Sequence, residues 1–425
     1  MAEQLRTPGA PEVDFDHYSP LFGDRYFDVA RELNRLGVAY SPHHGGFYVI
    51  AGYEQVNQAL VDPATFRSGR PADEPELQGI LIPSNYHGLP VVPAECDGKQ
   101  HRDLRKAMLP QFSKQAAEAW RGRFLHWATV LIDDAVETGT IDLAAEYANP
   151  LAFIFAVELL GLPVEDWRKW QEPAHGVNFA PPGSTELEWA TDLWAANLAE
   201  LAETIRDRRA NPADDFISLL AGSEIDGEPI PDEDVLSLCV IVMLGAVDTT
   251  SSLMTNALVH LDEHPELRAG LAADEAALAV AIEEWLRYFT PTHGTGRTVA
   301  KDTEVGGCPM HRGDRVMLSY LSANHDPAKF TNPDAIDLAR SPNPHLAFAG
   351  GVHKCVGLHF ARIEALMGIQ QVLLRLPDYE LRHEGRVDTP NAALVRGHFH
   401  LPADFTPGRR VTAQRAPGAR ASGMH

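Results

Sequence analysis

The residue with the clearest chemical potential is a cysteine that follows a glycine-rich turn. Cys355 lies within Phe348–Gly357, Phe-Ala-Gly-Gly-Val-His-Lys-Cys-Val-Gly, and opens a predicted amphipathic helix over Cys355–Leu376. At a helix entrance, unpaired backbone N–H groups and the helix dipole favour a thiolate. The sequence therefore predicts that the pKa of Cys355 is lowered toward neutrality. Gly350 and Gly351 allow a tight turn and a close approach to a flat ligand.

The type of residue alone leaves three roles open for Cys355. A buried structural thiol is the commonest fate of a free cysteine, and a nucleophile or a metal ligand are the alternatives. The remaining cysteines, Cys96, Cys239 and Cys308, are scattered and form no close pair. A disulfide framework and a zinc knuckle are therefore not expected.

A second chemical group follows a long apolar run. Leu236–Leu244 is almost wholly apolar, and Gly245–Thr250 continues it as Gly-Ala-Val-Asp-Thr-Thr. An Asp and two Thr are poor choices for a buried helix unless they have a function. The hydroxyl of Thr249 can reach the carbonyl of Gly245, four residues earlier, and loosen the helix so that a polar groove opens. The alternative is a helix that emerges into solvent at Asp248.

The segment around the cysteine resembles the haem-binding loop of the cytochrome P450 family. The family pattern is Phe-x-x-Gly-x-(His or Arg)-x-Cys-x-Gly, and Phe348, Gly351, His353, Cys355 and Gly357 match every position. The resemblance implies that Cys355 is the axial thiolate of the iron in haem b (iron protoporphyrin IX). It also implies that Phe348 shields the sulfur and that His353 bonds a haem propionate. Thiolate ligation pushes electron density onto the iron and favours cleavage of the O–O bond.

The segment Gly245–Thr250 resembles the oxygen-binding signature of the same family, (Ala/Gly)-Gly-x-(Asp/Glu)-Thr-(Thr/Ser). Ala246 replaces the usual second glycine. The resemblance implies that Thr249 holds dioxygen and its proton-donating water, and that Asp248 relays protons. Such a reaction needs a positioned proton source.

An acid and two bases follow the order of a third family motif. Glu284 and Arg287 lie three residues apart on one predicted helix face, and Arg340 precedes Phe348 by eight residues. Alone such a pair is a weak signal, since exposed pairs are frequent and contribute little. Because the order resembles the family's Glu-x-x-Arg motif and its arginine partner, we expect these three residues to lock the loop that carries Cys355.

Four basic residues resemble a clamp for the haem carboxylates. His101 and Arg105 lie on one face of a predicted short helix, and Arg297 follows the Glu-x-x-Arg helix. Each of them alone is more often a solvated surface charge. The resemblance implies that these three residues and His353 bind the two propionates through charge-assisted hydrogen bonds.

The substrate pocket is predicted from position in the family order. Its residues are mostly apolar, which favours a compact hydrophobic substrate such as a terpenoid or an aromatic compound. Core packing explains the same residues equally well, and a larger biosynthetic intermediate is an open alternative. The predicted pocket residues are Ile241, Leu244, Gly245, the loop Ile80–Ala94, His293, Leu394 and Val395.

Hydrophobic periodicity predicts a mainly α protein with small β-sheets. The resemblance implies the cytochrome P450 fold, a triangular helical prism with a β-rich side. We expect one such domain over 21–406, between an N-terminal arm at 1–20 and a flexible tail at 407–425. Helices are predicted over Glu118–Glu137, Ala144–Leu160, Thr185–Arg208, Asp232–His260, Ala273–Tyr288 and Cys355–Leu376, and strands within Phe47–Gly52 and Thr298–Leu318.

Composition argues against several classes of partner. Asp and Glu number 59 against 36 Lys and Arg, so the formal net charge is −23. This charge argues against nucleic acid or an anionic membrane as the main partner. No run approaches the roughly 18 apolar residues that span a bilayer, and the N-terminus lacks the pattern of a secretion signal. We therefore expect a cytoplasmic protein without a membrane anchor.

The resemblance implies a haem-thiolate monooxygenase that activates dioxygen and hydroxylates or epoxidises a small to medium hydrophobic substrate. The sequence carries no dinucleotide-binding glycine motif, flavin domain or iron–sulfur cysteine set, so electrons are expected from a ferredoxin or flavodoxin with a reductase. Arg102, Lys106, Lys354 and Arg362 are candidates for a basic surface that docks this carrier.

Two alternatives stay open at this point. A haem-thiolate enzyme can use peroxide, or catalyse coupling, dehydration or nitration in place of hydroxylation. A haem sensor or electron carrier is the second alternative, and Asp248 and Thr249 argue against it.

Overall fold

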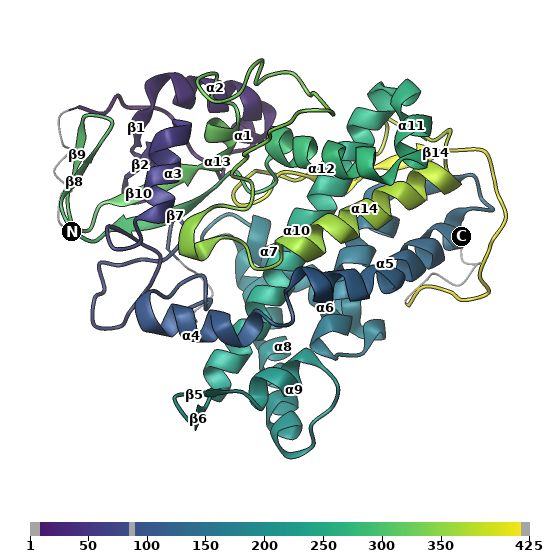
Figure 1. The fold of residues 1–425 in the computed structure, drawn as a ribbon, viewed down its shortest axis with the longest axis horizontal. Helices are drawn as coiled ribbons and strands as arrows, with labels where there is room; N and C mark the ends of the chain where they lie inside the picture. The colour runs from purple at the N-terminus through teal and green to yellow at the C-terminus, as the bar shows by residue number, and fades with distance from the viewer. Residues whose placement is uncertain (1–8, 85–89, 418–425) are drawn as a thin grey trace.

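The computed structural model describes residues 9–84 and 90–417, and helices dominate this part of the chain. The predicted class, mainly α with small β-sheets, is confirmed. Figure 1 shows most of the long helices gathered around α10, whereas the largest sheet lies beside them with the N-terminal helices. The helices are α1 (Pro20–Asp24), α2 (Tyr26–Leu36), α3 (Tyr53–Val61), α4 (Gly98–Met108), α5 (Lys114–Ala135), α6 (Asn149–Leu160), α7 (Trp167–Phe179), α8 (Thr185–Ala210), α9 (Phe216–Ala221), α10 (Asp232–Glu263), α11 (Arg268–Ala273), α12 (Glu275–Phe289), α13 (Tyr320–Asn324) and α14 (Leu358–Arg375).

The strands are short and lie in separate sheets. The largest sheet has five strands in the order β1-β2-β10-β7-β3, with β2 and β10 parallel and the other neighbours antiparallel. The strands are β1 (Val38–Ser41), β2 (Phe47–Ile50), β3 (Phe66–Arg67), β4 (Thr140–Asp142), β5 (Glu224–Ile225), β6 (Glu228–Pro229), β7 (Gly294–Val299), β8 (Thr303–Val305), β9 (Cys308–Met310), β10 (Arg315–Ser319), β11 (Glu380–Leu381), β12 (Val387–Asp388), β13 (His398–His400) and β14 (Pro402–Asp404).

Helix α10 forms the centre of the main hydrophobic core. It packs against α6, α8, α12 and α14, and α14 packs in turn against α5. Three acids in its first turn, Asp232, Glu233 and Asp234, complement the positive end of the helix dipole. The core helices therefore position the two predicted chemical groups, since α10 carries Thr249 and α14 begins shortly after Cys355.

Two helical segments reach the length and mean hydropathy of a bilayer-spanning helix, although both contain charged residues. They are Leu143–Leu160 and Asp232–Glu263, and most of their residues are buried inside the protein. Burial on nearly all sides in a large core accounts for their apolar composition.

Both ends of the described chain pack against the domain. The backbone N–H of Val13 donates to the carbonyl of Tyr40 at 2.9 Å. Within the segment predicted as a flexible tail, the backbone N–H groups of Val411 and Thr412 donate to the Asp133 carboxylate at 2.8 and 2.7 Å. The rest of that tail, 418–425, and residues 1–8 of the predicted arm lie outside the described residues.

Candidate active site

A cavity of about 310 Å³ lies between α10, α4 and the loop that precedes α14. Most of the side chains around it are apolar. The loop before α4, predicted to line the pocket, contributes Ile80, Pro93 and Ala94, while its residues 85–89 lie outside the described part of the chain. The predicted site residues that line the cavity are His101, Arg105, Ile241, Gly245, Thr249, Arg297, Phe348, His353, Cys355 and Gly357.

The cysteine loop is a closed turn seated on α3. The backbone N–H of Cys355 donates to the carbonyl of Phe348 at 3.0 Å. Gly351 has a φ of +62°, and a Cβ on it would lie 2.1 Å from the carbonyl oxygen of Leu60. Glycine is therefore required at this position by conformation and by space. It packs the loop against α3 and does not itself line the cavity.

The environment of Cys355 differs from the prediction in one respect. Its side chain is open to the cavity and otherwise surrounded by protein. Burial raises the pKa of the Cys355 thiol, and this outweighs the lowering by the backbone N–H groups of Gly357 and Leu358 and by the charges of Arg105 and Arg362. The prediction of a lowered pKa from the helix entrance alone was wrong. A coordinating metal is what deprotonates such a thiol.

Asp248 and Thr249, two polar residues of α10, lie in different environments. The hydroxyl of Thr249 lines the cavity and donates to the carbonyl of Gly245 at 2.8 Å, which confirms the predicted back-bond. Asp248 is 5% exposed and does not line the cavity. Its carboxylate lies 2.9 Å from Nε2 of His175 and accepts a 2.6 Å hydrogen bond from the amide of Asn178, both on α7.

Glu284, Arg287 and Arg340 meet in one buried cluster. Arg287 donates to both oxygens of Glu284 at 2.8 and 2.9 Å, and Nε of Arg340 donates to Glu284 at 2.9 Å. Arg287 also donates to the carbonyls of Asn324 and Pro333, which precede the cysteine loop. The cluster thus connects α12 to the segment that leads to Cys355.

The four basic residues of the predicted clamp lie together, but they have different partners. Arg105 donates to the carbonyl of Lys354. Nη1 of Arg297 donates to the hydroxyl of Thr295 at 2.9 Å and to the carbonyl of Gly296 at 2.6 Å. The rings of His101 and His353 lie 4.2 Å apart between centroids.

Asp97 is a further partner in the clamp that sequence reasoning missed. Nε2 of His353 lies 3.2 Å from its carboxylate, which also accepts hydrogen bonds from Arg67 and from the backbone N–H of Gly69. Burial acts to raise the pKa of Asp97, but the hydrogen bonds from His353, Arg67 and Gly69 outweigh it and hold that pKa well below its usual value. His353 therefore binds a charged acid of the protein itself.

His101 is held in its neutral form. Burial lowers its pKa to about 4, and the charges of His353 and Arg105 act in the same direction. Its Nε2 is buried and has no hydrogen-bond partner among the described residues. It is therefore a free polar atom at the edge of the cavity.

Four residues predicted to contact substrate lie outside the lining of this cavity. Leu244, His293, Leu394 and Val395 do not line the cavity described above. His293 is buried among aromatic rings, and Val395 forms a β-bridge with Thr292. Leu244 packs against the main hydrophobic core. These positions depend on long-range packing, which family order alone does not give.

Glu364 is another cavity residue that the sequence analysis did not identify. It lies on α14, lines the cavity and is 1% exposed, and its Oε1 has no hydrogen-bond partner among the described residues. Burial raises the pKa of Glu364 well above its usual value, so the side chain is a neutral acid. The available signal was a carboxylate inside the apolar run Ile363–Met367.

Comparison with known proteins bears directly on this site. The family model described as cytochrome P450 matches residues 276–395. A steroid C26-monooxygenase from Mycolicibacterium smegmatis is 30% identical over 392 residues, covering 90% of this chain and 94% of the relative. Cytochrome P450 109 from Bacillus spizizenii is 30% identical over 389 residues, covering 89% of this chain and 92% of the relative. The chain belongs to the cytochrome P450 family.

The fold of this cytochrome P450 agrees with solved structures. The structure of CYP268A2 from Mycobacterium marinum in complex with pseudoionone has a TM-score of 0.83 at 26% identity, and the match covers 94% of this chain and 100% of that chain. The predicted cytochrome P450 fold is thereby confirmed. The protein is a cytochrome P450 monooxygenase with a haem-iron cofactor, and it uses dioxygen, a small-molecule substrate and redox partner proteins.

The cavity of this cytochrome P450 fits the haem that the family carries. A thiol faces an apolar chamber whose edge carries two arginines and Nε2 of His101, for which the described residues offer no hydrogen-bond partner. A porphyrin needs an apolar chamber for its ring and donors for its two carboxylates. The apolar lining supplies the chamber, the side chains of Arg105, Arg297 and His101 supply the donors, and Cys355 adds the thiol.

Proposed function

We propose that this cytochrome P450 hydroxylates or epoxidises a small to medium hydrophobic organic substrate at a haem b bound through Cys355. The observation that supports the proposal is one apolar cavity lined by both the thiol of Cys355 and the hydroxyl of Thr249. When bound, the haem supplies the iron at which dioxygen is reduced and activated. Electrons come from an external ferredoxin or flavodoxin with its reductase.

Three residues of the clamp have free capacity for the haem carboxylates. Arg105 and Arg297 carry fixed positive charge, and neutral His101 offers a hydrogen-bonding nitrogen. His353 has a different role in this proposal, because its Nε2 already contacts Asp97. It orients the loop next to Cys355, and its other ring nitrogen would donate to a haem carboxylate only in the protonated form of the ring.

In this proposal, residues on two sides of α10 deliver the protons. Thr249 presents a hydroxyl to the cavity, where it would orient a water that delivers protons. Asp248 lies one residue earlier and faces α7, where His175 is 18% exposed. We infer that protons enter from solvent at His175, pass to Asp248 and reach the cavity through waters near Thr249.

The apolar lining favours a hydrophobic substrate. Ile241, Val242, Ala246 and Leu253 face the cavity from α10, and Ile80 faces it from the loop before α4. Apolar side chains with few polar groups bind by burial of apolar surface and give little electrostatic selection. The substrate class we propose is therefore a compact apolar molecule such as a terpenoid or an aromatic compound.

Of the four basic residues predicted to dock the electron carrier, Arg362 has a different role in this proposal. Arg102, Lys106 and Lys354 are exposed near the cavity. Arg362 instead forms a bidentate pair with Glu283, at 2.6 and 2.7 Å, and its guanidinium lies over the Phe348 ring. We propose that the first three bind an acidic carrier and that Arg362 stabilises the cysteine loop. A cytoplasmic location is part of the same proposal.

A carbon monoxide spectrum tests the ligand. Reduced, haem-loaded protein is expected to show the red-shifted Soret band of thiolate ligation, and Cys355→Ala is expected to abolish it. Cys308→Ala, which removes a buried thiol outside the cavity, is the matched control and should keep the band. Persistence of the band in Cys355→Ala would exclude Cys355 as the ligand.

Product analysis with labelled dioxygen tests the reaction. Incorporation of one labelled oxygen atom into product, dependent on NAD(P)H and the carrier, supports the proposal. Turnover with peroxide alone, or products without labelled oxygen, would favour peroxygenase, coupling or dehydration chemistry. A screen of hydrophobic compounds for the low-spin to high-spin Soret shift selects the substrates for this experiment.

A further inference from the structure

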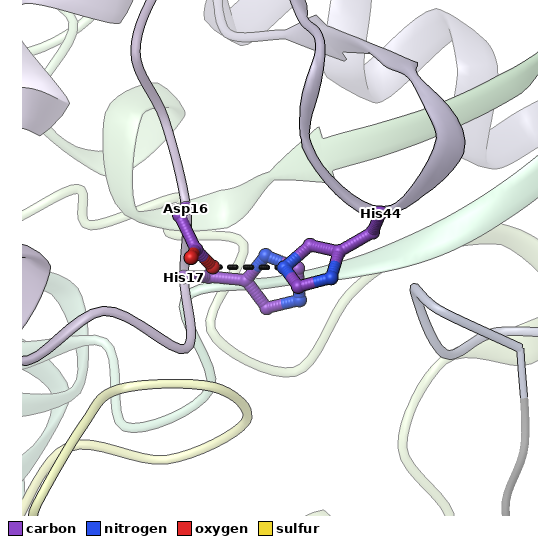
Figure 2. Close-up of side chains that lie close together, drawn as sticks. All are labelled: Asp16, His17 and His44. Carbon is purple, nitrogen blue, oxygen red and sulfur yellow. Dashed lines mark hydrogen bonds and ion pairs between the residues drawn. The ribbon is translucent and has the colours of Figure 1, made fainter. Parts of the chain in front are cut away.

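We propose that Asp16, His17 and His44 form a binding site for a divalent transition metal ion such as Zn²⁺, separate from the haem cavity. Each residue offers one ligand atom, and these atoms all lie within 4.8 Å of one another (Figure 2). None of the three lines the cavity that contains Cys355. Two imidazole nitrogens and one carboxylate oxygen, with a fourth position for water, are a suitable ligand set for Zn²⁺.

His17 gives the strongest support because one of its ring nitrogens is buried and unused. The residue is 2% exposed, and its Nε2 lies 2.6 Å from the carbonyl oxygen of Ile82. A carbonyl accepts only, so Nε2 carries the proton and Nδ1 carries a free lone pair. Nδ1 has no hydrogen-bond partner among the described residues, and Figure 2 shows the ring facing His44.

The buried Nδ1 of His17 would be stabilised by a bonding partner. Leaving a buried acceptor unsatisfied costs free energy, and a bound cation would remove that cost. A backbone carbonyl that fixes the tautomer through the other ring nitrogen is also the usual outer contact of a metal-binding histidine. Burial, together with the nearby His293 and His44 rings, holds the pKa of His17 well below its usual value.

The other two ligands are already placed at the same point. Oδ1 of Asp16 lies 2.8 Å from Nε2 of His44 and accepts a 2.9 Å hydrogen bond from the backbone N–H of Tyr18. Their side chains are 28% and 16% exposed, so an ion can enter from solvent. A metal ion would replace the direct contact between Asp16 and His44 and bind both of them, with His17 as the third ligand.

The site would join three segments that are distant in sequence. Asp16 and His17 belong to the N-terminal segment, and His44 lies in the turn between β1 and β2. Through its bond to Ile82, His17 also contacts the loop whose Ile80 lines the haem cavity. Binding of a metal ion to the folded form alone is therefore expected to raise the melting temperature.

Titration of the purified, haem-loaded full-length protein with Zn²⁺ after chelator treatment tests the site. Loading with haem keeps Cys355 from binding the added metal. We expect one tight equivalent by calorimetry, with a melting temperature several degrees higher at saturating metal. Asp16→Asn and His44→Gln are expected to weaken that equivalent at least about tenfold and to remove the thermal shift.

His43→Gln is the matched control. His43 is the adjacent imidazole, but it pairs with Asp14 at 2.7 Å and is outside the cluster. It should keep the affinity and the thermal shift of the parent protein. Because the His17 side chain is buried, its removal could disturb the fold. Zn²⁺ binding by His17→Ala is therefore interpreted only if the variant has the same Soret spectrum as the parent protein. Equal Zn²⁺ binding by the parent, Asp16→Asn and His44→Gln, or no tight equivalent in the parent, would overturn the proposal.

Discussion

The carboxylate of Asp248 lies 2.9 Å from Nε2 of His175 and accepts a 2.6 Å hydrogen bond from the amide of Asn178. Both partners belong to α7, so a neighbouring helix holds the acid of α10 and turns it away from the cavity that Thr249 lines. The His175 ring also stacks on Phe399, with centroids 5.2 Å apart. The buried acid thus has a titratable neighbour that solvent reaches.

Replacing His175 with Gln tests this route for protons. The variant removes a titratable ring next to Asp248, and a positioned proton carrier contributes about 10²–10⁴-fold to a rate. We expect product formation to fall at least about tenfold, with a larger kinetic solvent isotope effect. Asn178→Ala removes a hydrogen bond from the same carboxylate without removing a titratable group. Equal losses in both variants would show that His175 acts only as a structural contact.

Replacing Thr249 with Ala is expected to uncouple the reaction. The hydroxyl that lines the cavity is lost, so reducing equivalents are used without a positioned water to direct the protons. NAD(P)H consumption should continue, hydrogen peroxide should be released, and product should be scarce. Thr255→Ala is the control, because that hydroxyl bonds the carbonyl of Ser251 on the same helix and lies outside the cavity. Unchanged coupling in Thr249→Ala would remove this residue from the proposed role.

The parts of the site that could be predicted depend on local spacing. Thr249 reaches the carbonyl of Gly245 because residues four apart adjoin on a helix, so the bond follows from sequence. The predicted helix at Thr185–Arg208 corresponds to α8, Thr185–Ala210, because its apolar residues recur at three- and four-residue spacing along the chain. In the cysteine motif, Gly351 has a positive φ, a backbone conformation that favours the glycine found at this position of the motif.

The parts that sequence reasoning missed depend on segments brought together by packing. No local pattern pairs Asp97 with His353, or Asp248 with His175, because their segments meet only in the folded protein. The pKa of Cys355 is another example. The helix entrance lowers it and burial raises it, and only the structure gives the relative size of the two effects.

Breaking the buried cluster at Arg287 is expected to destabilise the protein strongly. Glu284 and Arg287 are both 0% exposed, so Arg287→Ala leaves a buried carboxylate without its main partner. Removing one member of a buried ion pair costs about 3–5 kcal/mol, whereas an exposed pair contributes about 0–1 kcal/mol. Arg31→Ala, which removes an exposed pair with Asp28, is the control. Urea unfolding of both variants measures the difference, and similar small losses would contradict a structural role for the cluster.

Replacing Glu364 with Gln should change how stability depends on pH. Burial raises the pKa of Glu364 in the folded state, so folding favours the protonated acid. Its contribution is complete below the unfolded-state pKa, near the usual 4.5 of a glutamic acid, and is lost as pH rises toward the folded-state pKa. The amide of the variant does not titrate and has no such loss, so the stability of Glu364→Gln relative to the parent should increase with pH.

The pKa of Glu283 is shifted in the opposite direction to that of Glu364, so Glu283→Gln serves as the comparison. Burial acts to raise its pKa, but Arg362 and His345 outweigh this effect and lower the pKa to about 2. Its contribution is therefore present above the unfolded-state value near 4.5 and is lost as pH falls toward 2. Urea unfolding of Glu364→Gln and Glu283→Gln across the acid to neutral range should give stability differences of opposite slope. Parallel slopes would mean that Glu364 is ionised in the folded protein, and it would then need a cation partner that the described residues do not supply.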